Sequence, residues 1–139
     1  MISETLLRVN YSETDQMGVV YHARYLVWLD IARTEHLRHT GVTYAELEQR
    51  GLRLAVADLR VRYRQPARYD DEVRVRCWVR ECVPRRVIFG YAVDAPARAL
   101  LLATAETSMI VLGPDFAWSR LPEPIVASLP VSPDPVRLF

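Results

Sequence analysis

This sequence has only two cysteines, no lysine and no long apolar run. The two cysteines, Cys77 and Cys82, form no CxxC pair and have no supporting histidines, which argues against a disulfide framework or a zinc site and favours reduced thiols. No apolar run approaches the length of a membrane span, and the short stretch before Arg8 carries an acidic residue, so we expect neither a membrane anchor nor a signal peptide. We therefore expect a cytoplasmic protein.

The absence of lysine makes all 18 basic residues arginine. Arginine suits recognition of phosphate or carboxylate groups, although codon composition is the simpler explanation. The formal net charge of +1 draws the chain neither to nucleic acid nor to a membrane surface. A length of 139 residues fits one domain with a sizeable core and leaves no room for a second.

The segment 15–41 is the one around which the rest of the chain is organised. Its apolar residues recur at helical spacing, with Tyr25, Trp28, Leu29 and Ala32 on one stripe and Leu26 and Ile31 widening it. We expect a helix over 21–40, about 30 Å long, that ends at the left-handed residue Gly41. A helix that is apolar on most sides is buried, so this one should be the core element.

The remaining elements are mostly strands. A weak alternation predicts a first strand over 6–11, and Thr43 with Glu46 forms a capping box that predicts a short helix over 43–50. From residue 54 the period changes to two, with alternating stretches near 59–64, 73–80 and 87–93 and a more apolar strand over 100–112. Short turns between them favour an antiparallel meander.

These elements predict an α+β domain over 1–128, in which a curved five-stranded antiparallel sheet wraps one long central helix. Beyond Gly113 the chain carries six prolines, so we expect it to be extended or poorly ordered from there on, with residues 129–139 as a Pro-rich tail outside the domain. An open sheet leaves strand edges with unpaired backbone groups. We therefore expect a homodimer, or a homotetramer built from it.

One motif resembles a known family. Asp15, Gly18, the pair Val19 and Val20, Tyr21, His22 and Tyr25 match, in order and spacing, the N-terminal signature of hotdog-fold acyl-CoA thioesterases of the 4-hydroxybenzoyl-CoA thioesterase and YbgC type. The stretch RLPEPI at 120–125 is similar to an ending common in that group. The resemblance implies the hotdog fold and hydrolysis of an acyl thioester, chiefly acyl-CoA, without a cofactor or a metal.

Thioester hydrolysis needs an attacking oxygen and stabilisation of the developing oxyanion. Asp15 can act as general base on water or attack directly as a nucleophile. Backbone N–H groups at the helix start, by resemblance that of His22, can donate to the carbonyl oxygen, while the His22 imidazole orients Asp15 or water. The hydroxyl of Tyr11 either holds the carboxylate or the substrate, or belongs to an ordinary strand aromatic.

The substrate-binding residues are expected at the same motif and at one distant turn. Gly18 lets the backbone turn closely around the acyl group. The other expected contacts are Val20, Tyr21 and Tyr25 at the pocket and Arg85 and Arg86 on the CoA phosphates. For the two arginines a solvated turn is the competing interpretation.

Three other functions stay open. The substrate can be an acyl-carrier-protein thioester rather than acyl-CoA, the domain can bind acyl-CoA without hydrolysing it, or it can be a structural domain that dimerises through its sheet. Thiol release from a panel of acyl-CoAs separates an enzyme from the last two. The sequence does not fix which acyl group is cleaved.

Overall fold

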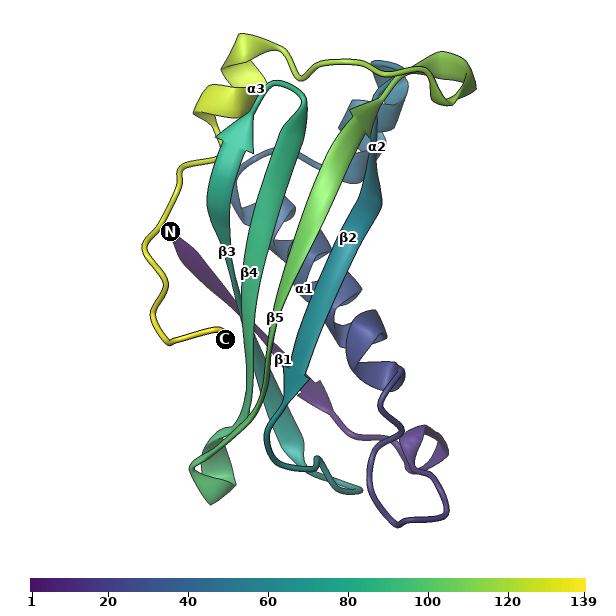
Figure 1. Ribbon diagram of the computed structural model, residues 1–139, viewed down its shortest axis with the longest axis vertical. Coiled ribbons are helices and arrows are strands. Elements are labelled where there is room, and N and C mark those ends of the chain that lie inside the picture. The colour runs from purple at the N-terminus through teal and green to yellow at the C-terminus, as the bar shows by residue number, and fades with distance from the viewer.

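The computed structural model describes residues 1–139 as one α+β layer structure. A five-stranded antiparallel sheet curves around one side of the central helix (Figure 1). The helices are α1 (Arg24–His39), α2 (Tyr44–Gln49) and α3 (Glu123–Ala127). The strands are β1 (Ile2–Arg8), β2 (Arg53–Tyr63), β3 (Glu72–Val83), β4 (Arg86–Ala95) and β5 (Leu100–Leu112). This arrangement is the predicted hotdog fold.

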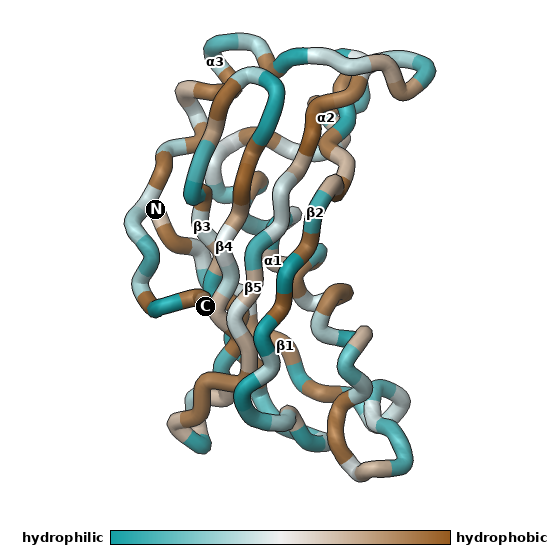
Figure 2. Tube along the Cα trace, in the orientation of Figure 1, coloured by the Kyte–Doolittle hydropathy of each residue, from teal (hydrophilic) through white to brown (hydrophobic).

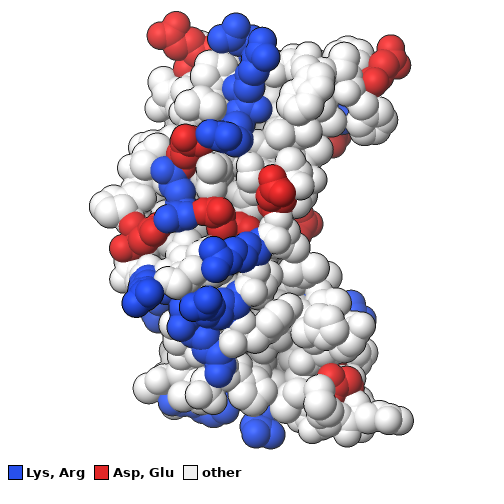
Figure 3. All heavy atoms as spheres, in the orientation of Figure 1, with Lys and Arg blue, Asp and Glu red and all other residues white.

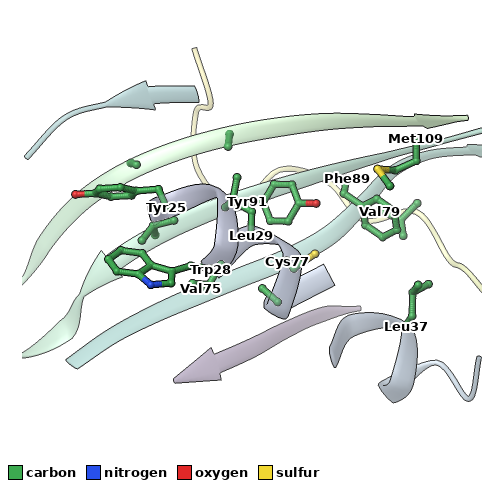
Figure 4. Close-up of a cluster of buried hydrophobic side chains, with 14 of the residues drawn as sticks. Tyr25, Trp28, Leu29, Leu37, Val75, Cys77, Val79, Phe89, Tyr91 and Met109 are labelled. Carbon is green, nitrogen blue, oxygen red and sulfur yellow. The ribbon is translucent and has the colours of Figure 1, made fainter. Parts of the chain in front are cut away.

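The main core lies between α1 and the concave face of the sheet. It is a cluster of 27 buried residues, in which the buried stripe of α1 meets alternate residues of β3, β4 and β5 (Figure 4). Val73, Val75, Cys77 and Val79 all face the helix from β3, as the period-two pattern predicted.

None of the three helices combines the length and the apolar character that a membrane-spanning helix needs.

The strand order is β1-β3-β4-β5-β2, so the predicted meander covers only β3 to β5. β2 pairs with β5 rather than with its sequence neighbour β3. Residues 64–71 are therefore a crossover between separate strands and not a hairpin turn, which corrects the sequence-based expectation. The pattern of alternation identifies strands but does not say which strands pair.

The central helix is shorter than predicted and is buried on one side only. α1 begins at Arg24 because residues 21–23 form a turn in which the Arg24 N–H donates to the Tyr21 carbonyl (2.9 Å). It ends as predicted, with Gly41 at φ +85°. Leu26 and Ile31, which were expected to be buried, are each more than a third exposed.

Two other boundaries test the sequence analysis. The α2 capping box is confirmed: the Thr43 hydroxyl accepts from the Glu46 N–H (3.2 Å) and the Glu46 carboxylate accepts from the Thr43 N–H (3.0 Å). The first strand was misplaced, because β1 spans Ile2–Arg8 and Tyr11 lies in a separate 3-10 turn at Tyr11–Glu13.

The chain end is extended, and it packs on the convex face of the sheet as a strap, residues 130–139 (Figure 1). Beneath this strap Trp78 is completely buried in a second small cluster with Ala92 and Leu138. The Trp78 indole N–H donates to the Asp134 carboxylate (2.9 Å), and the Ser132 N–H donates to the Val79 carbonyl (2.9 Å). The tail is therefore an ordered part of the domain.

Candidate active site

Residues 9–23 connect β1 to α1, and Glu13 fastens this loop at both ends. One Glu13 carboxylate oxygen accepts from the Asn10 N–H (2.9 Å), and the other accepts from the Trp28 indole N–H on α1 (2.8 Å). The Glu13 carbonyl accepts from the Tyr21 N–H (2.9 Å). Glu13 was missed by the sequence analysis, although Asn10 and Glu13 have the spacing of a capping box.

Asp15 sits in a tight turn at the far point of this loop. Its N–H donates to the Val19 carbonyl (2.9 Å), and its own carbonyl accepts from Gly18 (3.0 Å). One carboxylate oxygen accepts from the Met17 N–H (2.8 Å), which orients the side chain. Gly18 has φ +75° with nothing within 4 Å of an added side chain, so glycine is required there by the backbone conformation.

Asp15 faces a cavity of about 280 Å³ between the loop, the first turn of α1 and the segment that leaves β2. Half of the ten lining residues are hydrophobic, so an apolar group can be held against the carboxylate. The lining consists of Asp15, Met17, Val19, Val20, His22, Tyr25, Tyr63, Arg64, Gln65 and Pro66. Of the residues predicted for the site, the structure brings Asp15, Val20, His22 and Tyr25 together here.

At the start of α1, the N–H groups of His22, which lines the cavity, and of its neighbour Ala23 have no hydrogen-bond acceptor in the chain. The N–H groups on either side of them do have acceptors. The Tyr21 N–H donates to the Glu13 carbonyl, and the Arg24 N–H donates to the Tyr21 carbonyl. No acceptor of the chain lies on the His22 or Ala23 N–H. Because these groups stand at the positive end of the α1 dipole, they can stabilise negative charge on a ligand oxygen.

Two tyrosines form the wall opposite Asp15. Tyr25 is buried on α1, and its hydroxyl accepts from the Ala67 N–H (3.0 Å), which fastens the crossover; burial raises the pKa of this phenol. Tyr63, the last residue of β2, packs edge-on against the Tyr25 ring and donates its hydroxyl to the His22 carbonyl (2.7 Å). Tyr63 was not predicted; its only signal is its place at the end of an alternating strand.

Four predicted residues lie away from the cavity wall. Tyr11 is exposed, packs edge-on against Tyr69 and makes no hydrogen bond to Asp15. Tyr21 is exposed against the His22 ring. Arg86, the first residue of β4, pairs with Glu81 of β3 (2.6 Å), and its neighbour Arg85 is exposed in the turn between the two strands. This β3–β4 turn lies at the other end of the sheet from the loop before α1 (Figure 1). Functional roles for these four residues stay predictions.

The hotdog fold, with Asp15 and His22 at one cavity beside the start of α1, is the arrangement that the motif predicted for the hotdog thioesterases. The family model described as Thioesterase-like superfamily matches residues 9–122, which is most of the chain. The chain belongs to the thioesterase-like superfamily, and this membership confirms both the family predicted from the motif and the enzyme class, a thioester hydrolase.

Individual relatives agree with the family match. The acyl-CoA thioester hydrolase YbgC of Escherichia coli O6:H1 is 34% identical over 122 residues, covering 87% of this chain and 90% of that protein. A DHNA-CoA thioesterase structure from Staphylococcus aureus has a TM-score of 0.82 and 33% identity, covering 86% of this chain and 80% of the other. The hypothetical protein TT1821 of Thermus thermophilus has a TM-score of 0.85 and 37% identity, covering 91% and 96%.

Proposed function

We propose that this protein hydrolyses acyl-CoA to a free acid and coenzyme A, with Asp15 as the catalytic carboxylate. The observation that carries the proposal is the meeting of Asp15 and the unpaired helix-start amides at one largely apolar cavity. The names of the relatives support the substrate class, since the Escherichia coli protein is called an acyl-CoA thioester hydrolase and the Staphylococcus aureus protein a DHNA-CoA thioesterase.

The amides hold the thioester oxygen while the carbonyl carbon is attacked. As the carbonyl becomes tetrahedral, negative charge grows on this oxygen, and each well-placed donor stabilises it by roughly 3 kcal/mol. The Met17 N–H occupies one Asp15 oxygen and leaves the other for catalysis. That oxygen either takes a proton from the attacking water or adds to the carbonyl carbon to give a mixed anhydride, which water then cleaves.

Collapse of the tetrahedral intermediate breaks the carbon–sulfur bond. The electron pair leaves with sulfur as the CoA thiolate, which needs no strong acid because a thiol ionises far more readily than an alcohol. The proton taken up by Asp15 passes to solvent or to the thiolate, and the carboxylate is restored. This chemistry uses only residues of the chain.

We also propose that the working unit is a homodimer formed along β2. This strand is a free sheet edge of 11 residues, with Val56 and Leu59 exposed. On the same side of the molecule, Leu26 of α1 is partly exposed and borders a hollow that it shares with Val56 and Leu59 of β2. Pairing two such edges satisfies their backbone groups and covers the apolar face of the helix. Further association to a homotetramer is compatible with this dimer.

Replacing Asp15 tests the proposed chemistry. Asp15→Asn keeps the size of the side chain but can neither accept a proton nor attack, so turnover should fall about 100-fold or more. Thiol release from aromatic and aliphatic acyl-CoAs measures this, with Asp70→Asn as the control, because Asp70 is an exposed loop residue whose φ of +65° suits asparagine.

Three outcomes separate the candidate functions. Near-wild-type turnover by the Asp15→Asn variant would remove Asp15 from the mechanism. Binding of acyl-CoA without turnover by the unmodified protein would favour the non-catalytic module. Turnover restricted to acyl-carrier-protein thioesters would favour the carrier-protein thioesterase, a function named for some members of the wider family.

A further inference from the structure

Tyr63 makes the one side-chain hydrogen bond to the backbone turn that carries the unpaired amides. Its hydroxyl donates to the His22 carbonyl at 2.7 Å, from β2 across to the start of α1. From Asp58 onward β2 alternates hydrophilic and hydrophobic residues (Figure 2). Arg62 and Arg64 contact the chain end on the convex face, so Tyr63 between them points to the α1 side. The alternation of side chains along β2 thus places the Tyr63 hydroxyl at the start of α1.

The bonded carbonyl and an unpaired amide belong to the same peptide. The His22 C=O and the Ala23 N–H share one planar unit and point in opposite directions, so holding the oxygen fixes where the N–H is aimed. A hydrogen bond to the oxygen also polarises the peptide and makes its N–H a stronger donor. Arg24 is the first helical residue, so no intrahelical bond restrains this peptide.

The Tyr63 ring is itself held in place. It packs edge-on against Tyr25 with ring centroids 5.1 Å apart, and edge-on against His22 at 6.3 Å. Tyr25 is buried and bonded to the crossover, so Tyr63 is braced by a fixed neighbour rather than by a mobile loop. Its own ring is about half exposed, and its hydroxyl has no other partner.

From this geometry we infer that Tyr63 is a positioning residue for the oxyanion site: it holds the His22–Ala23 peptide so that the Ala23 N–H, with that of His22, is aimed at the thioester oxygen. The inference rests on the proposed function. It adds a second donor and a tyrosine that orients it. Because the aim matters only where charge develops, loss of the hydroxyl should affect turnover rather than substrate binding.

The test removes the hydroxyl and keeps the ring. Tyr63→Phe should lower kcat about tenfold with KM within about twofold, since one donor is misaimed rather than lost. Tyr69→Phe is the matched control, because Tyr69 is similarly exposed and its hydroxyl has no hydrogen bond within the chain. In parallel, the backbone ¹⁵N resonance of Ala23 should move in the Tyr63→Phe variant and stay fixed in the control, which reports the broken bond independently of activity.

Each outcome decides the matter. A moved Ala23 resonance with kcat unchanged would overturn the inference, as would a rise in KM with kcat unchanged, which would make the hydroxyl a substrate ligand. An Ala23 resonance that does not move would also overturn it. Failure of the unmodified protein to hydrolyse any acyl-CoA would instead overturn the proposed function, and the inference with it.

Discussion

His36 is completely buried in α1, yet its imidazole has one hydrogen-bond partner. Nδ1 lies 2.8 Å from the Ser3 hydroxyl, whereas Nε2 has none, and the Phe89 ring packs edge-on against the imidazole. Burial lowers the pKa of His36 to about 4, with smaller contributions from the charged chain start and from His39. Its place in the core and its bond to Ser3 make His36 a structural residue.

Stability should therefore fall on mild acidification. The pKa of His36 is lower in the folded chain than in the unfolded chain, so the unfolded chain binds more protons between about pH 6.5 and pH 4. Over that window the free energy of unfolding should decrease by up to about 3 kcal/mol as pH falls. Urea unfolding at a series of pH values measures the slope.

His39→Gln is the control for this prediction, because His39 is exposed on the same helix. His39→Gln should keep the decrease, and His36→Gln should lack the part due to His36, whatever its stability at neutral pH. Equal slopes in both variants would show that another group causes the acid sensitivity.

Among the elements, β3 and β4 meet at a place where only glycine fits. Gly90 stands opposite Trp78 in the strand register, and a side-chain carbon there would lie 2.6 Å from the indole. The indole cannot move away, since it is buried under the strap and bonded to Asp134. The small cluster on the convex face therefore depends on this pair.

Gly90→Ala should destabilise the protein by about 1–3 kcal/mol, because the added methyl group overpacks the contact. Denaturant unfolding measures this, and Gly113→Ala is the control, since its nearest side-chain atom is 3.4 Å away and its φ of −101° suits alanine. If Gly90→Ala matched the unmodified protein in stability, the strap would have to lift or shift easily, contrary to the packing described.

Sequence patterns predicted the elements much better than their connections. The helix stop at Gly41, the Thr43 capping box and the bounds of β5 follow from local chemistry that a short window contains. The partner of β2 does not, because pairing is decided by contacts far apart in sequence. The same distinction applies at the site. Asp15 belongs to a short motif, so the sequence could predict it, whereas Tyr63 lies 41 residues from the carbonyl it binds and no local pattern connects the two.

For the whole molecule, the main question is how one acyl-CoA could contact both the cavity at Asp15 and the predicted phosphate contacts Arg85 and Arg86, because these lie at opposite ends of the sheet. Arg85 and Arg86 follow β3, whose 12 residues span roughly 40 Å at about 3.3 Å each, while the cavity lies near its start. Arginine side chains also gather at both ends of the convex face, with acidic ones between them (Figure 3). In a dimer paired antiparallel along β2, the partner is reversed, which can bring its arginines toward this cavity.

Mixed dimers test this arrangement. Replacing both arginines by Ala should raise KM for acyl-CoA roughly tenfold with little change in kcat, and should not affect a truncated acyl-pantetheine. If the arginines serve the partner's site, a mixture with the Asp15→Asn chain contains mixed dimers with one intact site. Random exchange should then restore kcat/KM to about a quarter of the unmodified value, against about a twentieth if they act within their own chain.

Two controls accompany the mixture. Chains kept from exchanging should show no recovery, and dilution that separates the dimer should abolish activity if the site depends on both chains. Full specific activity in monomers would contradict the dimer proposal. An equal loss on acyl-CoA and acyl-pantetheine would mean that Arg85 and Arg86 support the fold instead.

The strap has an optical consequence. It places Trp78 in an apolar setting outside the main core, while Trp28 is bonded to the loop that carries Asp15 and Trp118 is largely exposed. The protein's three indoles therefore sit in three separate places. With Trp118 replaced by Phe, the tryptophan fluorescence of the chain comes from one indole beneath the strap and one bonded to the loop that carries Asp15. Detachment of the strap should then appear as a red shift of the emission, because it exposes Trp78 to water.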